Sequence, residues 1–177
     1  MNARSSEALA HGVQLRPAVR SDARKIRSLI LRVGINPTGL EWRRFIVAED
    51  AAGRFIGCGQ VKVHKDGSRE LASIAVEEAW RRRGIGSRLV RELMHQHDPP
   101  LWLTCRSNLT EFYGRYGFVE VVDPAQMTRT FRKIVRLARM FHWLAPGEHL
   151  AVMVWRGSGT LPPGQRRVGS SDPADLR

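Results

Sequence analysis

The feature that most restricts the fold of this chain is a glycine-containing turn, Arg81-Arg82-Arg83-Gly84-Ile85-Gly86. The residues before it, 70–76, are predicted to form a strand. After it, Ile85, Leu89 and Leu93 recur at helical spacing. A strand that leads through a tight turn into an amphipathic helix is typical of helices packed on a sheet, so the turn favours an α/β fold.

The rest of the chain extends this pattern to a mixed sheet with helices on its faces. The predicted elements are, in chain order, a strand at 13–15, a helix at about 21–33, strands at 45–49, 55–64 and 70–76, the helix after the turn, a strand at 101–105, a short helix after Asn108, a strand at 118–122, an insert at 126–143 and a strand at 150–156. Asp66-Gly67 indicates a hairpin. We expect Ser21 to cap the first helix, and Asn108 with Glu111 to form a capping box.

The length of the chain, 177 residues, fits one domain. We expect tails at 1–12 and 157–177 around a domain at 13–156, because the last segment is rich in Gly, Ser and Pro. No stretch approaches the roughly 18 apolar residues of a membrane-spanning helix, and no signal peptide is visible. Two cysteines cannot make a disulfide framework, so we expect a cytoplasmic protein.

The charge of the chain is strongly positive: 29 Lys and Arg against 17 Asp and Glu, a net +12. Such a field attracts nucleic acid, an anionic membrane surface or a phosphate-rich small molecule, and composition does not choose among them. No recognised nucleic-acid motif is present. We therefore expect no nucleic-acid partner, although a nucleic-acid-binding basic domain remains an alternative.

The turn has the chemistry of a phosphate site. Backbone N–H groups at a helix start lack partners, and the helix dipole favours an anion there. Two glycines admit a pyrophosphate closely, the arginines add charge, and Ser87 adds a hydroxyl. The turn is neither a P-loop nor Gly-x-Gly-x-x-Gly, because Leu89 stands at the last position. Alone, the pattern also fits a basic helix start.

A second motif makes the pattern specific. Asn108 and then Phe112-Tyr113-Gly114-Arg115-Tyr116-Gly117-Phe118 follow the strand at 101–105. Together with Arg81-x-x-Gly84-x-Gly86, this arrangement resembles the GCN5-related N-acetyltransferase (GNAT) superfamily over about residues 13–156. The resemblance implies an α/β GNAT fold with a largely antiparallel mixed sheet, splayed between its fourth and fifth strands, and helices on both faces.

The resemblance also implies a site for acetyl-coenzyme A as cosubstrate. The strand at 70–76 would pair with the pantetheine arm as an added strand does. The turn would hold the pyrophosphate, and Asn108 would bind the arm. The implied binding residues are Ile74, Ala75, Val76, Arg81, Arg82, Arg83, Gly84, Ile85, Gly86, Ser87, Asn108 and Tyr113.

Two residues carry the implied catalysis. Tyr113 stands at the family's general-acid position, where a phenol can protonate a departing thiolate; otherwise it is a core aromatic, with Tyr116 as the fallback acid. Glu70 matches the base of histone-type members, since an ammonium must lose a proton before it attacks. Its alternatives are a solvated charge paired with Lys62 or Arg69, or replacement by a water chain.

The other reactive side chains are expected to be structural. We expect Cys58 and Cys105 to be buried strand residues, which disfavours an acyl-cysteine route. His95 and His97 point to different faces of a helix and no His-Glu-x-x-His occurs, so no metal is expected.

The insert at 126–143 is unusual because one helical stripe is apolar and the rest is basic. The apolar positions are Met127, Phe131, Ile134, Ala138 and Phe141, and the basic ones are Arg129, Arg132, Lys133, Arg136 and Arg139. The insert is interpreted in three ways: a lid that holds an acidic acceptor, a helix in weak contact with a membrane surface, or a packed helix with a solvated face.

We therefore predict an enzyme that acetylates a primary amine of an amino acid, another small amine or a protein, by direct attack in a ternary complex. A non-catalytic coenzyme-A-binding domain is an alternative. The segment Glu-Leu-Ala-Ser-Ile-Ala-Val at 70–76 faintly resembles amino-acid-acetylating members such as N-acetylglutamate synthases. The sequence identifies neither the acceptor nor the oligomeric state, monomer or homodimer.

Overall fold

The computed structural model describes residues 12–140 and 149–157, with the side chains of 139 and 140 excepted. The tails expected at 1–12 and 157–177 lie almost wholly outside the described residues, as does the end of the insert, 141–143. None of the described helices is long and apolar enough to cross a membrane.

The described residues form seven strands and four α-helices, joined by short 3-10 turns. The strands are β1 (Gln14–Pro17), β2 (Phe45–Glu49), β3 (Phe55–Val63), β4 (Arg69–Val76), β5 (Leu101–Arg106), β6 (Val119–Glu120) and β7 (Leu150–Trp155). The helices are α2 (Ala23–Arg32), α3 (Ile85–His95), α4 (Thr110–Gly114) and α5 (Arg129–Met140). The 3-10 turns are η1 (Arg20–Asp22), η2 (Trp42–Arg44), η3 (Glu78–Trp80), η4 (Ser107–Leu109) and η5 (Pro124–Gln126).

One sheet contains all seven strands in the order β1-β2-β3-β4-β5-β7-β6. The β4–β5 pair is parallel and every other pair is antiparallel. The hairpin predicted at Asp66-Gly67 joins β3 to β4, and Gly67 adopts the positive φ of 80° that this turn requires. The predicted α/β class, the order of the elements and the largely antiparallel mixed sheet are confirmed.

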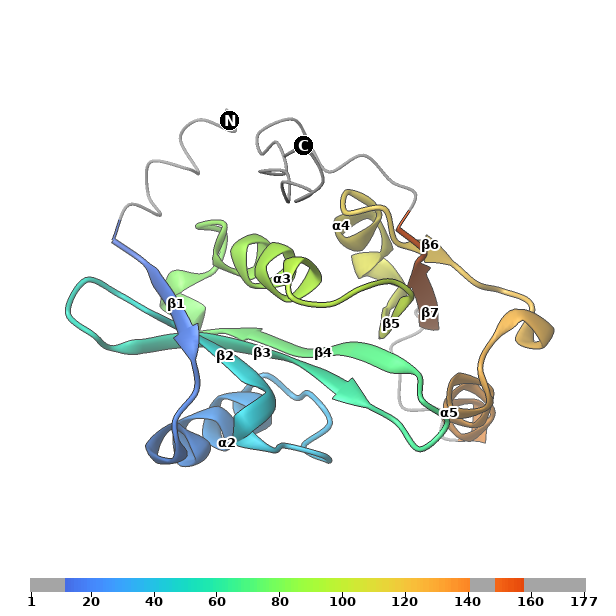
Figure 1. The fold of residues 1–177 in the computed structure, drawn as a ribbon, viewed down its shortest axis with the longest axis horizontal. Coiled ribbons are helices and arrows are strands. Elements are labelled where there is room, and N and C mark those ends of the chain that lie inside the picture. The colour runs from blue at the N-terminus through green and yellow to red at the C-terminus, as the bar shows by residue number, and fades with distance from the viewer. Residues whose placement is uncertain (1–11, 141–148, 158–177) are drawn as a thin grey trace, which may run out of the picture.

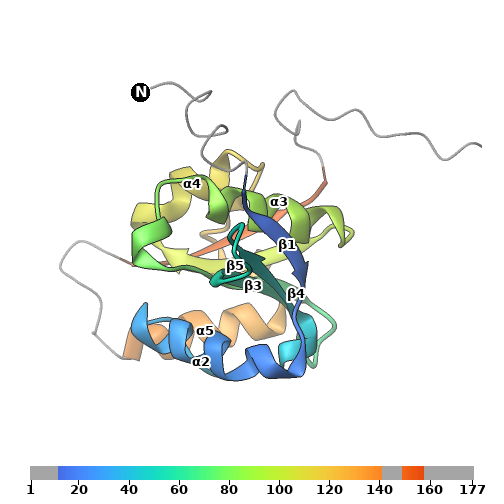
Figure 2. The same ribbon diagram turned by 90° about the vertical axis from the view of Figure 1, so that its left-hand side faces the viewer.

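Helices cover both faces of the sheet. α3 and α4 lie on one face, and α2 and α5 lie on the other (Figures 1 and 2). On the α3 face the stripe predicted from Ile85, Leu89 and Leu93 is fully buried against β3 and β4. On the opposite face, Ile26 and Ile30 of α2 pack on β2 and β3. The sheet therefore has a separate apolar core on each face.

The apolar stripe of the insert forms a third core beneath β5 and β7. Phe131 of α5 is completely buried, and its ring stacks on Trp102 of β5 with a centroid separation of 5.1 Å. Met127 and Ile134 complete the contact, so the predicted stripe is confirmed at these positions. Arg132, Lys133 and Arg136 are exposed on the rest of the helix.

Two predictions about helix starts are wrong. Ser21 lies inside η1 and the residue at the start of α2 is Asp22, whose carboxylate instead accepts from the Val19 N–H at 2.9 Å. Asn108 lies inside η4, so the N-cap residue of α4 is Leu109. Its apolar side chain cannot accept a hydrogen bond from the helix start. In both places a 3-10 turn precedes the helix and shifts the cap position by one residue.

Candidate active site

The central feature of the site is an opening in the sheet. β4 and β5 pair at Arg69↔Leu101 and Glu70↔Trp102, and no further pair joins them in the described structure. Each strand nevertheless continues, to Val76 and Arg106, and the two diverge (Figure 1). The splay that the family resemblance implied is therefore present. It leaves one backbone edge of β4 without a neighbouring strand, as the addition of an extended ligand requires.

A bulge in β4 shapes this edge. The register with β3 shifts between Cys58 and Gln60, which places Ser73 and Ile74 together opposite Gly59. Ser73 has a φ of 58°, and a Cβ on Gly59 would lie 2.5 Å from the end of the Ile74 side chain, which would have to move to admit it. Bulges of this kind redirect side chains beside functional sites.

The bulge is supported by a buried polar pair that the sequence did not reveal. Gln60 is completely buried, and its Nε2 donates to Ser73 Oγ at 3.0 Å. Gln60 Oε1 has no hydrogen-bond partner among the described residues. A buried amide oxygen without a partner is costly, and such atoms mark places where a ligand or water completes the structure.

The glycine turn lies at the wide end of the opening, where β4 leads through η3 into α3. Gly84 is the N-cap residue of α3 and has a φ of 78°, and Arg82 has a φ of 59°. No group in the described part of the chain accepts a hydrogen bond from the backbone N–H groups of residues 82–87. Gly86 faces open space except for Val76 Cγ2, which a Cβ would meet at 4.0 Å. The turn thus presents free donors and an unobstructed backbone, which fit a diphosphate.

The three arginines of the turn differ in their contacts. Arg81 Nε donates to the Val76 carbonyl oxygen at 3.2 Å, so part of its guanidinium holds the end of β4. Arg83 lies over the Trp80 ring at 4.9 Å. All three side chains are exposed at the rim of the turn, where they add positive charge. On the adjoining strand, the Ala75 carbonyl oxygen lies close to Gly57 of β3, 3.0 Å from the position that a Cβ on Gly57 would take.

α4 brings Tyr113 to the α3 side of the opening. Its ring packs edge-on against Phe112 at 5.0 Å and Phe118 at 6.1 Å, within the core on that face. Burial, with a smaller contribution from nearby Cys105, raises the pKa of Tyr113 above its usual value. The phenol therefore remains protonated at neutral pH, as a general acid must. Tyr116, the fallback acid, is more buried than Tyr113. Asn108, the residue expected to bind the pantetheine arm, is exposed beside the start of α4.

Glu70 lies at the base of the opening, and the alternative interpretation of Glu70 as a solvated charge is wrong. The residue is 7% exposed. Its Oε1 accepts from Thr104 Oγ1 of β5 at 3.1 Å, and its Oε2 lies 2.9 Å from His64 Nε2. Lys62, its direct neighbour on β3, donates instead to the Thr38 carbonyl oxygen.

The sequence prediction missed His64 and Thr104. His64 had a detectable signal, because a hairpin turn at Asp66-Gly67 with Lys62 opposite Glu70 places His64 diagonally beside Glu70 on the same face. Thr104 had none, since its contact with Glu70 depends on how β4 and β5 meet.

The expectation of buried cysteines is confirmed. Cys58 lies in β3 and Cys105 in β5, both buried. Burial raises the pKa of Cys58 to about 12 and that of Cys105 to about 11. Thiols that hold their protons this firmly are poor nucleophiles, which disfavours an acyl-cysteine route. Among the described residues no cluster of His, Cys, Asp and Glu is arranged to hold a metal ion.

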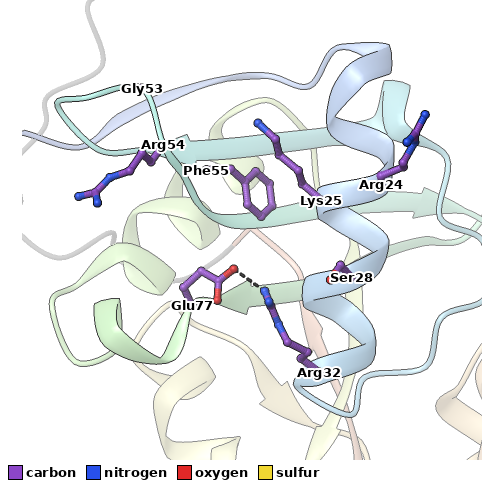
Figure 3. Close-up of a pocket in the computed structure, with 8 residues that line it drawn as sticks. All are labelled: Arg24, Lys25, Ser28, Arg32, Gly53, Arg54, Phe55 and Glu77. Atoms are coloured by element: carbon purple, nitrogen blue, oxygen red, sulfur yellow. Dashed lines mark hydrogen bonds and ion pairs between the residues drawn. The ribbon is translucent and has the colours of Figure 1, made fainter.

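A pocket of about 590 Å³ lies apart from these residues, between α2, the turn that joins β2 to β3, and Glu77 (Figure 3). None of the predicted site residues lines it. Its wall is basic, and Arg32 forms an ion pair with Glu77. The lining residues are Arg24, Lys25, Ser28, Arg32, Gly53, Arg54, Phe55 and Glu77.

The fold and the site together define a class of protein: an α/β domain whose sheet opens beside a glycine turn with free donors. A family model described as Acetyltransferase (GNAT) domain matches residues 41–120. A curated relative, glucosamine 6-phosphate N-acetyltransferase 1 of Oryza sativa subsp. japonica, is 37% identical over 86 residues, which cover 42% of this chain and 52% of the relative. The chain therefore spans about half the length of this relative.

Solved structures share the fold. N-acetylglutamate synthase from Neisseria gonorrhoeae, complexed with coenzyme A and N-acetyl-glutamate, superposes with a TM-score of 0.64 at 22% identity, over 81% of this chain and 35% of that one. Rv2747 from Mycobacterium tuberculosis, in complex with CoA and NLQ, superposes with a TM-score of 0.60 at 24% identity, over 81% of this chain and 98% of that one. Residues 41–120 are therefore similar to a GNAT acetyltransferase domain, and the two solved structures have the same fold as this chain.

Proposed function

We propose that this protein is an N-acetyltransferase that moves the acetyl group of acetyl-coenzyme A to a primary amine by direct attack in a ternary complex. The observation that carries the proposal is the opening between β4 and β5, with Tyr113 on its α3 side and Glu70 at its base. The free N–H groups of residues 82–87 supply the diphosphate site at its mouth.

The residues divide the work as follows. The open edge of β4 at residues 74–76 and Asn108 would orient the pantetheine arm, and the glycine turn would hold the phosphates. The thioester supplies the acetyl group when the cosubstrate is bound. Glu70 Oε would take the proton of the amine, and the Tyr113 hydroxyl would donate a proton to the departing sulfur.

The two proton-transfer groups belong to opposite faces of the sheet, which supports a ternary complex. Tyr113 packs in the α3-side core, whereas the Glu70 carboxylate bonds to His64, whose ring touches Phe131 of α5 on the opposite face. A thioester entering from one face and an amine from the other would meet in the opening.

The acceptor class that we propose is an amine that also carries a carboxylate, such as an amino acid. Its support is the exposed basic face of α5, whose first turn is tied to the hairpin beside Glu70 by a hydrogen bond from the Thr130 N–H to Asp66 Oδ2 at 2.8 Å. Arginine and lysine at that place suit an acidic acceptor.

The test has two stages. Calorimetry with coenzyme A and acetyl-coenzyme A should show saturable binding, and duplex DNA should give none. Release of coenzyme A thiol is then followed with a panel of amino acids, polyamines, aminoglycosides and peptides. Binding of coenzyme A without turnover of any amine would favour the non-catalytic alternative. Tight, salt-sensitive binding of DNA alone would favour the nucleic-acid alternative.

A further inference from the structure

The β3–β4 hairpin holds a histidine against the carboxylate of Glu70. His64 directly follows β3, and the turn closes around it: its N–H donates to the Ser68 carbonyl oxygen at 2.9 Å, and its own carbonyl accepts from the Gly67 N–H at 3.0 Å. The backbone position of His64 is therefore fixed. Its Nε2 lies 2.9 Å from Glu70 Oε2.

Helix α5 fixes the ring itself. The edge of the imidazole meets Phe131 at a centroid separation of 5.7 Å and an angle of 80°. The position of the Phe131 ring is fixed, because the ring is completely buried and stacks on Trp102 of β5, the residue that pairs with Glu70. Phe131, His64 and Glu70 thus form a continuous chain of contacts from the insert to the base of the opening.

Thr104 completes the arrangement from the other strand. It donates to Glu70 Oε1 at 3.1 Å, so each carboxylate oxygen already has one partner and neither can rotate freely. A carboxylate accepts only, so the partner nitrogen of His64 is assigned as N–H. Among charged neighbours, Lys62 from β3 faces the carboxylate, and its ammonium is held by Thr38. The remaining lone pairs of Glu70 are left for a third partner.

We infer that His64 is the positioning residue of Glu70, and that the insert serves the site by holding His64 through Phe131. The inference rests on the proposed function, in which Glu70 takes the proton of the amine. His64 does not touch the substrate in this scheme. It orients the carboxylate so that proton transfer occurs without a prior rotation, which lowers the barrier to the chemical step and leaves the binding of both substrates unchanged.

Two substitutions separate this role from mere packing. His64→Leu removes the donor, whereas His64→Gln keeps an N–H near the position of Nε2. We expect His64→Leu to lower kcat about ten- to a hundredfold with unchanged KM for acetyl-coenzyme A. His64→Gln should retain most of the activity. In a Glu70→Gln background, His64→Leu should cause no further loss, because the group that it positions has gone.

Controls make each outcome decisive. His149→Leu removes a second His–Glu contact, the 3.1 Å pair with Glu120, and should leave kcat unchanged. If His64→Leu does not fold, Phe131→Leu replaces it. This variant should lower kcat in the wild-type background and should have no effect on kcat in the Glu70→Gln background. If His64→Leu lowers kcat equally in the wild-type and Glu70→Gln backgrounds, or lowers it in neither, the inference is overturned. The proposed function still stands in that case, provided that the wild-type enzyme turns over. Absence of wild-type turnover with every amine overturns both.

Discussion

Thr104 of β5 donates a hydrogen bond to Glu70 of β4 at 3.1 Å, at the last point where the two strands still pair. The residues are 34 positions apart, so the bond exists only because the strands meet at Glu70↔Trp102. It fixes the carboxylate at the base of the opening and joins the two halves of the sheet there. Parallel strands usually continue to pair, and here the bond marks where pairing stops.

Glu70→Gln tests the proposed base. The amide keeps the size of the side chain and its acceptor toward Thr104 but cannot take a proton at neutral pH. We expect kcat to fall by about two to four orders of magnitude, with the Kd for acetyl-coenzyme A unchanged. Steady-state kinetics and calorimetry on the same preparation measure both. A kcat near that of the wild type would assign proton removal to water.

Tyr113→Phe tests the proposed acid. Loss of the hydroxyl should lower kcat about a hundredfold without weakening coenzyme A binding, because the ring still fills its place between Phe112 and Phe118. Tyr116→Phe is the matched control and should remain active. The reverse result, a loss confined to Tyr116→Phe, would transfer the acid role to Tyr116.

The glycines of the turn should respond differently to alanine. Gly84 has a φ of 78°, so Gly84→Ala introduces strain of about 1–2 kcal/mol and should lower Tm by roughly 2–8 °C. A Cβ at Gly86 meets nothing closer than 4.0 Å, so Gly86→Ala should keep Tm. Gly86→Ala should nevertheless weaken the binding of coenzyme A at least about tenfold, since the added methyl group would occupy the space through which the phosphates approach the backbone. Differential scanning fluorimetry and calorimetry separate the two effects. Unchanged affinity in Gly86→Ala would place the diphosphate elsewhere.

Local chemistry made most of the fold predictable. The Asp66-Gly67 hairpin, the helix stripe through Ile85 and Leu89, and the apolar stripe through Phe131 were readable because turns and periodicity depend on neighbours in sequence. The splay between β4 and β5 was reached only through family resemblance, since no periodicity encodes where two strands stop pairing.

The surroundings of Glu70 were the least predictable part of the site. Its partners come from the far side of a hairpin and from another strand, and a charged residue at a strand end ordinarily faces solvent. The bulge at Ser73 was equally hidden, because it arises from the shift in register opposite Gly59 rather than from any preference of serine. Predictions of helix caps failed where 3-10 turns intervened.

The buried thiols make stability depend on alkaline pH. Burial raises the pKa of Cys58 to about 12 and of Cys105 to about 11, whereas in the unfolded chain both ionise near pH 9. Above pH 9 the unfolded state therefore binds fewer protons than the folded state, so the free energy of unfolding falls as pH rises. We expect a loss of about 1 kcal/mol per pH unit or more between pH 9 and 11.

Comparison with a variant isolates the thiols from other groups that titrate at alkaline pH. Urea unfolding at intervals of pH should show a shallower decline when both cysteines are replaced by alanine. Identical slopes in the wild type and in Cys58→Ala/Cys105→Ala would mean that the thiols ionise as readily in the folded protein as in the unfolded chain.

The exposed basic face of α5 allows the acceptor proposal to be tested against its rivals. Arg132→Gln, Lys133→Gln and Arg136→Gln together remove three charges without touching the buried stripe. For an acceptor that carries a carboxylate, we expect KM to rise at least about tenfold, because charge-assisted hydrogen bonds to the acceptor are lost. The Kd for acetyl-coenzyme A should stay the same.

The matched control is the triple glutamine variant at Arg24, Lys25 and Arg27 of α2, which removes the same charge from exposed positions on another helix. If the two triple variants behave alike, the effect belongs to net charge rather than to α5. Co-sedimentation with anionic liposomes, run in parallel, distinguishes a membrane contact: loss of lipid binding with unchanged KM would assign the basic face to a membrane surface. If neither quantity changes, the face is simply solvated, because arginines on an exposed helix contribute solubility without recognition.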